Sequence, residues 1–137
     1  NNNDFNLKIL PLICYEIIYS GKLSKINNFD LIINISEDGW FGKSIGPHQH
    51  FAHSVFRAIE EGKSIIRSSN NGISAIIDPK GKIIKINKST SSGALSEYGF
   101  EKLSEMTVFS TYGRNNIFFY LVLIYITLIF FLKRQGR

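Results

Sequence analysis

The chain has 137 residues, of which 44% are hydrophobic and 13% aromatic, and its formal net charge is +5. This length suits one domain core of ordinary size, and this composition excludes an intrinsically disordered chain. The single cysteine, Cys14, excludes an internal disulfide framework and a multi-cysteine zinc site.

Short apolar runs predict strands in the first half of the chain. Residues 8–14 (KILPLIC) predict a buried strand, although Pro11 favours an edge position. Residues 29–36 (FDLIINIS) predict a strand covered on both faces, and the polar, aromatic loop 37–46 follows. "SIIRSS" at 64–69 predicts a third strand.

The remaining elements of this part are a helix and a hairpin. From Pro47, helical spacing predicts a helix that ends at Gly62, with an apolar face of Phe51, Val55, Phe56 and Ile59. "ISAIIDPKGKIIKI" predicts a hairpin turning at residues 78–81, after a turn at Asn70 and Asn71. Residues 88–105 predict a loop. Strands that alternate with helices indicate an α/β layer structure.

The C-terminal segment differs in kind from the rest. Residues 117–132 are sixteen uncharged residues followed by Lys133 and Arg134. A membrane-spanning helix needs about 20 apolar residues, and a buried core helix is the alternative at this length. Because the segment is apolar all round, we expect a membrane anchor, with residues 1–112 as one domain and 113–137 as the transmembrane helix. The basic residues at its end predict a cytoplasmic C-terminus.

Two clusters carry the excess of basic residues. For the cluster at residues 80–88, a solvated hairpin face is the simpler interpretation, and attraction to phosphate head groups is the alternative. Nucleic-acid binding is disfavoured, because no aromatic residues alternate with these lysines. The first cluster is Lys80, Lys82, Lys85 and Lys88, and the second is Lys133, Arg134 and Arg137.

Cys14 follows the first predicted strand directly. In α/β sheets, chemistry collects at the carboxyl ends of strands, and a helix that begins at Cys14 would favour the nucleophilic thiolate. A lone cysteine beside a strand can also be an inert buried residue.

Several segments together resemble a known family. "ICYE" after an apolar strand resembles the nucleophile strand of the nitrilase superfamily, whose members use a Glu-Lys-Cys triad. "DLIINISEDGWFGKSIGPHQHF", "FRAIEEGKSIIRSSNNGISAIIDPKGKI" and the apolar tail narrow the resemblance to the apolipoprotein N-acyltransferases within that superfamily. The resemblance runs from about Lys8 to the end. It implies part of a nitrilase-like α-β-β-α sandwich followed by a C-terminal transmembrane helix.

The resemblance also implies a function. That family moves an acyl chain from a phospholipid to the α-amino group of the diacylglyceryl-modified N-terminal cysteine of a lipoprotein, through a cysteine thioester and without a cofactor. It implies Cys14 as the nucleophile, Glu16 as a supporting residue, and Tyr15, Trp40 and Phe41 at the substrate, ordinary packing being the alternative for the last two. It places the protein in the bacterial inner membrane, with the catalytic domain facing the periplasm.

The family's general-base glutamate and lysine lie upstream of its cysteine, in segments that these 137 residues do not contain. The chain begins at Asn1 and has methionine only at Met106, so we expect a processed protein or the C-terminal part of a longer one. Two positions depart from the family pattern: Glu37 stands where Asn is usual, and Arg114 stands where Asp is common.

Other polar groups have simpler interpretations. His48, His50 and His53 invite a metal site, but no cysteine or carboxylate lies at ligand spacing beside them. Arg57 and Glu60 predict an ion pair within the helix.

Three functions therefore compete. The first is a membrane acyltransferase, the second a soluble nitrilase-type amidase or carbon–nitrogen hydrolase, and the third a non-catalytic membrane-anchored remnant. The apolar tail favours the first over the second.

Overall fold

The computed structural model describes residues 6–21, 23, 28–87, 93–97 and 99–135, without the side chains of Arg114 and Gln135. In this part of the chain, five strands form one mixed sheet in the order β1-β2-β3-β4-β5. β1 to β3 are parallel, and β4 and β5 join β3 antiparallel. The α/β fold class that the sequence predicts is confirmed. The strands are β1 Ile9–Ile13, β2 Leu31–Glu37, β3 Ser64–Asn70, β4 Ser74–Ile77 and β5 Ile83–Asn87.

β1 is an edge strand, hydrogen-bonded only to β2 among the described residues. This position explains how Pro11 fits into a strand, since proline cannot donate a ladder hydrogen bond. The parallel register aligns Ile13 of β1 with Ile35 of β2, so both strands end at the same edge of the sheet. That edge is where Cys14 follows.

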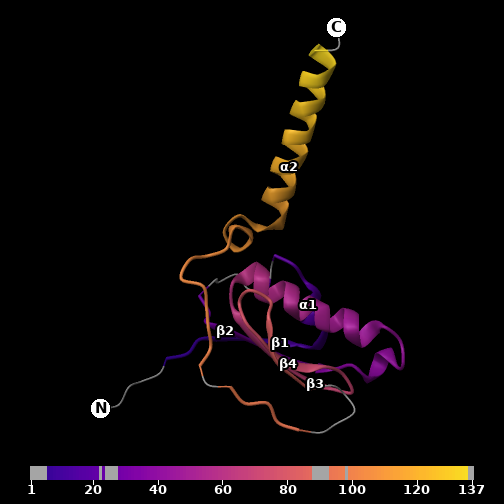
Figure 1. Ribbon diagram of the computed structural model, residues 1–137, viewed down its shortest axis with the longest axis vertical. Helices are drawn as coiled ribbons and strands as arrows, with labels where there is room; N and C mark the ends of the chain where they lie inside the picture. Colours follow the sequence, from indigo (N-terminus) through magenta and orange to yellow (C-terminus); the bar gives the residue numbers. More distant parts are fainter. Residues whose placement is uncertain (1–5, 22, 24–27, 88–92, 98, 136–137) are drawn as a thin grey trace.

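Helix α1, Gly46–Glu61, covers one face of the sheet (Figure 1). Pro47 lies in its first turn, and Gly62 ends it in the left-handed conformation with φ 64°, as the sequence predicts. Phe51 is buried, but the expectation that Phe56 and Ile59 face the core is wrong: they are 56% and 46% exposed. The face against the sheet is instead largely polar, because it carries His50, Ser54, Arg57 and Glu61.

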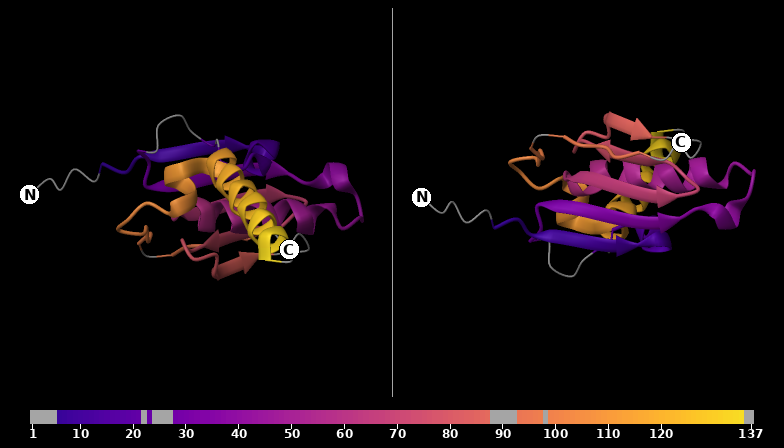
Figure 2. Two further views of the ribbon diagram at one scale, coloured as in Figure 1. Left: turned by 90° about the horizontal axis from the view of Figure 1, so that it is seen from above. Right: turned by 90° about the horizontal axis from the view of Figure 1, so that it is seen from below.

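The core lies between α1 and the sheet, and it includes Leu12, Ile17, Ile32, Ile65 and Ile77. The opposite face of the sheet has no described helix over it (Figure 2). Ile9, Ile13 and Ile35 of that face are 46%, 59% and 55% exposed. The prediction that β2 is buried on both faces is therefore wrong at Ile35, because no described segment covers this end of the sheet.

The hairpin β4–β5 turns at Asp78, whose carboxylate accepts hydrogen bonds from the backbone N–H groups of Lys80 and Lys82. The lysines of this hairpin are exposed, and Lys85 pairs with Glu97 at 3.1 Å, as on an ordinary solvated face. Lys88 lies outside the described residues. The described part of 88–105 contains no helix or named strand, as predicted, and Ser64 bonds to the carbonyl of Glu101 in it.

Helix α2, Val108–Gln135, leaves the domain on the side of α1 (Figure 1). Its backbone is interrupted at Gly113, with φ 71° and ψ 162°. The hydroxyl of Thr107, just before the helix, donates to the carbonyl of Glu60 in α1. Residues 115–134 are long and apolar enough to cross a membrane, with mean hydropathy 2.1 and none of their surface buried.

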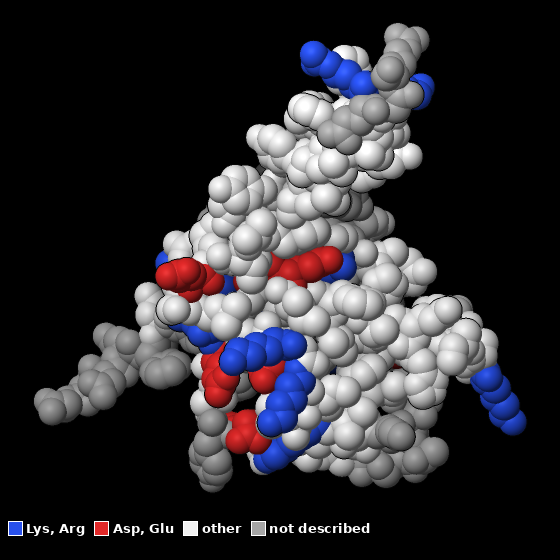
Figure 3. Space-filling view, turned by 45° about the horizontal axis from the view of Figure 1, so that its top comes forward, with Lys and Arg blue, Asp and Glu red and all other residues white. Residues whose placement is uncertain are grey.

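The space-filling view shows an uncharged column, formed by the middle of α2, between the charged domain and the basic residues at the end of the helix (Figure 3). Residues 115–134 have no buried surface in the described chain, which supports the membrane anchor over the buried-core alternative.

Candidate active site

Cys14 lies where β1 ends and the short 3-10 helix η1, Cys14–Ile18, begins. Its backbone is left-handed, with φ 46°, a conformation that costs a non-glycine residue about 1–2 kcal/mol. Such strain at a nucleophilic side chain is a common mark of a functional site. The element that begins at Cys14 is a 3-10 helix of only five residues, so its dipole is small.

Glu16 stabilises this turn from within η1. Its Oε2 accepts a hydrogen bond of 2.7 Å from the backbone N–H of Ile13, the residue before Cys14. The role of Glu16 that the resemblance implies is support of the site by hydrogen bonding, and this contact is compatible with it.

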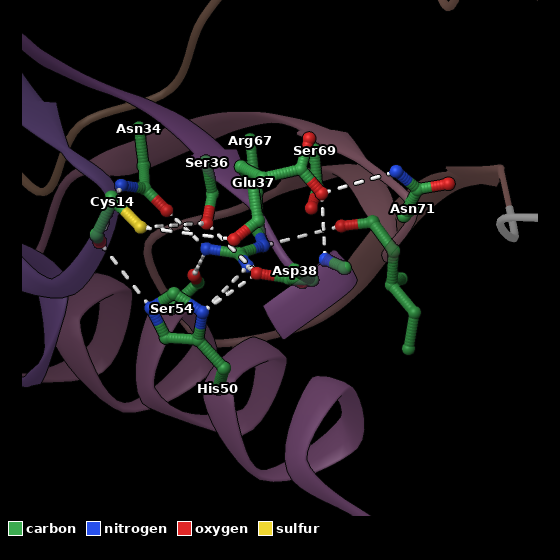
Figure 4. A network of polar contacts seen from close by, with 12 residues as sticks. Cys14, Asn34, Ser36, Glu37, Asp38, His50, Ser54, Arg67, Ser69 and Asn71 are labelled. Carbon is green, nitrogen blue, oxygen red and sulfur yellow. Dashed lines mark hydrogen bonds and ion pairs between the residues drawn. The ribbon is translucent and has the colours of Figure 1, made fainter. Parts of the chain in front are cut away.

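A buried polar network lies beneath Cys14, between β2, β3 and α1 (Figure 4). At its centre, Arg67 pairs with Asp38 at 2.8 Å, and both side chains are fully buried. Nδ1 of His50 lies 2.8 Å from Oδ1 of the same carboxylate, and Ser36 donates to that oxygen at 2.8 Å. Arg67 also donates to Oδ1 of Asn34 and, at 3.2 Å, to the carbonyl of Ile73.

The ion pair sets the charge of Asp38. Burial raises the pKa of this carboxyl, but the Arg67 guanidinium and the hydrogen bonds from His50 and Ser36 outweigh burial and hold the pKa below its ordinary value. Asp38 is therefore a buried carboxylate paired with a buried guanidinium.

The network reaches Cys14 at two atoms. The hydroxyl of Ser36 lies 3.7 Å from the sulfur, and the thiol points to the carbonyl of Glu37 at 3.9 Å. The carbonyl oxygen of Cys14 faces Nδ2 of Asn34 and Nε2 of His50, both at 3.3 Å. The sequence argument missed Asp38, Asn34, Ser36 and Arg67. Arg67 could have been predicted, because an arginine inside the apolar run "SIIRSS" needs a buried partner.

Two of the three predicted substrate-contacting aromatics lie at this site. The rings of Tyr15 and Phe41 have their centres 5.5 and 5.6 Å from that of His50. Trp40 is 88% exposed, so ordinary packing does not explain it. Tyr15 and Phe41 are thus near Cys14, whereas Trp40 extends from the neighbouring 3-10 helix η2, Gly39–Phe41, into solvent.

Glu37, the unusual residue of this loop, holds the turn at the end of β3. Its carboxylate accepts hydrogen bonds from Asn71, from the backbone N–H of Gly39 and from Asn70, and these lower its pKa. Asn71 has φ 53°, which confirms the predicted turn. The Arg114 side chain, the other departure, lies outside the described part of the structure.

The three histidines do not converge. No group of three or more His, Cys, Asp or Glu residues in the described chain is arranged to hold a metal ion. The Arg57–Glu60 ion pair is confirmed at 2.8 Å. Both residues also hold the segment after Cys14, because Arg57 donates to the carbonyl of Ile18 and Glu60 accepts from Ser20.

Residues 5–97 match the carbon-nitrogen hydrolase family, which is more than half of the chain. A cysteine at the carboxyl end of a parallel strand in an α/β domain agrees with that match. The chain belongs to the carbon-nitrogen hydrolase family.

Within that family, the curated relatives carry a more specific name. The apolipoprotein N-acyltransferase of Rickettsia typhi is 44% identical over 129 residues, 93% of this chain and 26% of that protein. Those of Wigglesworthia glossinidia brevipalpis and Photobacterium profundum are 51% identical over 81 residues and 37% over 132 residues. The resemblance seen in the sequence is confirmed, and the chain spans about a quarter of the length of such relatives as the first and third.

Proposed function

We propose that this chain carries the nucleophile of a membrane-bound N-acyltransferase that modifies lipoproteins. One observation carries the proposal: Cys14, strained at φ 46° and held by a buried network, directly follows a strand in a chain that is 44% identical to an apolipoprotein N-acyltransferase. The acyl donor is a phospholipid, and the acceptor is the α-amino group of a diacylglyceryl-modified N-terminal cysteine.

The reaction takes two steps at the Cys14 sulfur. First, the thiolate attacks an ester carbonyl of the phospholipid, a C–S bond forms, and the C–O bond breaks to release a lysophospholipid that takes up a proton. The acceptor amine then attacks the thioester, an amide C–N bond forms, and the thiolate leaves while the amine loses a proton. Both steps need a general base and an oxyanion donor. We assign these to a glutamate and a lysine outside the 137 residues.

The lipid substrates agree with the position of α2. We propose that residues 113–137 anchor the domain 1–112 in the bacterial inner membrane, with Gly113 at the boundary. Lys133 and Arg134 follow the uncharged run 117–132 and favour a cytoplasmic end, so the domain faces the periplasm. Trp40, Tyr15 and Phe41 then contact the acyl donor near the membrane surface, where aromatic side chains are favoured.

The test uses the protein expressed in its full natural reading frame, reconstituted with phospholipid. We expect an acyl group on Cys14 that hydroxylamine removes, and we expect none on the Cys14→Ser variant, since a hydroxyl is a far poorer nucleophile than a thiolate at neutral pH. Mass spectrometry of the peptide containing residue 14 measures both. The same adduct on Cys14→Ser would show that another residue is the nucleophile.

Fractionation separates this function from a soluble carbon–nitrogen hydrolase. We expect the protein in the membrane fraction, released only by detergent, because the exposed apolar helix has no place in water. Recovery in the soluble fraction without detergent would support the hydrolase instead.

A further inference from the structure

The strained backbone of Cys14 needs a restraint. A left-handed cysteine persists only where its surroundings hold it, because the extended and right-handed conformations are lower in free energy. The contacts with the Cys14 carbonyl, from Asn34 and His50 at 3.3 Å each, act directly on the peptide unit that follows the strained residue. They are therefore placed to fix it.

His50 is itself held on several sides. Asp38 fixes the ring at Nδ1, and Arg67 fixes Asp38 with contacts of 2.8 and 3.0 Å from one nitrogen to the two carboxylate oxygens. The rings of Tyr15 and Phe41 pack near the imidazole. With His50 only 2% exposed, the ring has little room to turn away from the Cys14 carbonyl.

Stability alone does not explain so polar a core. Replacing a buried ion pair by well-packed apolar residues is often neutral or stabilising. The Asp38–Arg67–His50 contacts can instead orient the backbone of Cys14, because the last of them is between His50 and the Cys14 carbonyl. Asn34 and Ser36 end on the same residue, at its carbonyl and its sulfur.

We propose that His50 is a positioning residue for Cys14: its ring, held at Nδ1 by Asp38 and Arg67, places Nε2 against the Cys14 carbonyl and thereby keeps the thiol aimed at the acyl donor. This rests on the acyl transfer proposed above. Displacing a reacting group by about 1 Å can cost about 10²-fold in rate. We expect a loss of about that size in the acylation of Cys14 when the contact is removed.

Two amide variants separate this contact from the rest of the side chain. In His50→Gln the longer side chain places its NH₂ group near the position of Nε2, so it can still reach the Cys14 carbonyl. In His50→Asn the shorter side chain reaches Asp38 but not the carbonyl. The matched control is His48→Gln, an exposed position on the same helix.

The measurement is the single-turnover rate of Cys14 acylation by phospholipid in nanodiscs, with Tm recorded for each variant. We expect His50→Asn to be about 100-fold slower than wild type and His50→Gln to recover at least about tenfold of that loss. The Tm values of the two variants should agree within about 3 °C, and His48→Gln should match wild type. Equal rates for His50→Asn and wild type, or equal losses in Asn and Gln, would overturn the proposal.

A second variant keeps the test decisive if both His50 variants unfold. Asn34→Asp keeps an oxygen for Arg67 but loses the amide that donates to the carbonyls of Cys14 and, at 3.1 Å, of Leu12. We expect it to slow acylation about tenfold, as loss of one such hydrogen bond of about 1.4 kcal/mol would. Acylation at the wild-type rate would count against the proposal.

If wild type itself forms no acyl adduct, the proposed function fails, and the positioning of Cys14 is judged by alkylation. The rate of iodoacetamide labelling at residue 14, measured by mass spectrometry, should be lower in His50→Asn than in His50→Gln. Equal labelling rates would overturn the positioning role independently.

Discussion

The left-handed backbone of Cys14 affects stability independently of the chemistry of its thiol, and this effect can be tested. Glycine has no Cβ and adopts φ 46° without the penalty that any other side chain meets. We therefore expect Cys14→Gly to be more stable than Cys14→Ala by about 1 kcal/mol in chemical denaturation, although neither variant can form a thioester.

The control for this pair is Ala52→Gly in the interior of α1. There the backbone is helical, and glycine should cost about 1 kcal/mol relative to alanine, the opposite sign. A Cys14→Ala protein that is the more stable of the two would show that residue 14 is not left-handed in solution.

Trp40 is proposed to contact substrate and does not pack in the core. Because it is 88% exposed, Trp40→Ala should change the free energy of unfolding by less than about 0.5 kcal/mol. If the indole contacts the acyl donor, KM for phospholipid should rise about tenfold, as loss of about 1.4 kcal/mol of contact would give. Steady-state kinetics with a mixed-micelle substrate measure this. An unchanged KM would leave Trp40 outside the substrate site.

At the scale of elements, unfavourable electrostatic interactions destabilise the C-terminus of α1. Glu60 and Glu61 end the helix, where the dipole disfavours negative charge. Burial, and then the neighbouring Glu60, raise the pKa of Glu61. A carboxyl whose pKa is raised by folding contributes stability below its unfolded pKa and loses it as pH rises through the folded pKa.

Glu61→Gln removes this charge with little change in shape. We expect the free energy of unfolding to increase by about 0.5–1 kcal/mol at pH 7 and to change little near pH 4, where the wild-type carboxyl is largely protonated. Denaturation at the two pH values measures the difference, with the exposed Glu105→Gln as the control. A gain of equal size at both pH values would contradict the assigned cause.

The strands, the helix and the hairpin could be predicted because each has a local signal. Pro47 and Gly62 mark the ends of α1, and the Asp-Pro-Lys-Gly turn joins β4 to β5. The orientation of α1 could not be predicted from hydrophobicity, since the buried face of the helix is mostly polar and Phe56 lies outside. A polar helix face is buried only where residues of other elements provide hydrogen-bond partners for it, and the hydrophobic periodicity of the helix does not predict those partners.

The site was predicted in part for the same reason. The position of Cys14 follows from the end of an apolar strand, and the turn at Asn71 follows from its sequence. The Asp38–Arg67 pair joins the residue after β2 to a residue of β3, 29 positions apart, and depends on the parallel register of β2 with β3. Single-sequence patterns carry no information on that pairing. The sequence suggested only a metal-binding role for His50, because other histidines lie close to it in the chain, whereas its partner Asp38 lies twelve residues away.

At the scale of the whole molecule, the uncovered sheet face and the surroundings of the thiol predict the behaviour of residues 1–137 expressed alone. The described partners of the Cys14 sulfur are the Ser36 hydroxyl and the Glu37 carbonyl, and neither is a base of useful strength. One missing oxyanion donor costs about 10²–10³ in rate. We expect this polypeptide to be catalytically inert and to aggregate through the face that exposes Ile9, Ile13 and Ile35.

The measurement is acyl transfer from phospholipid to a diacylglyceryl peptide in nanodiscs, with the full natural reading frame as the control. Light scattering during removal of detergent reports aggregation. Turnover within about tenfold of the control would mean that a base and an oxyanion donor lie within these residues after all.

Gly113 also determines how long the membrane-facing helix is. An unbroken helix over the 28 residues of α2 would extend about 42 Å at 1.5 Å per residue, well beyond a hydrocarbon core of about 30 Å. The break leaves residues 115–134, 20 residues or about 30 Å, as an unbroken helix in which polar residues flank the uncharged run 117–132 at both ends. Because φ 71° with ψ 162° is a conformation that only glycine adopts readily, this one residue determines where the straight apolar helix begins.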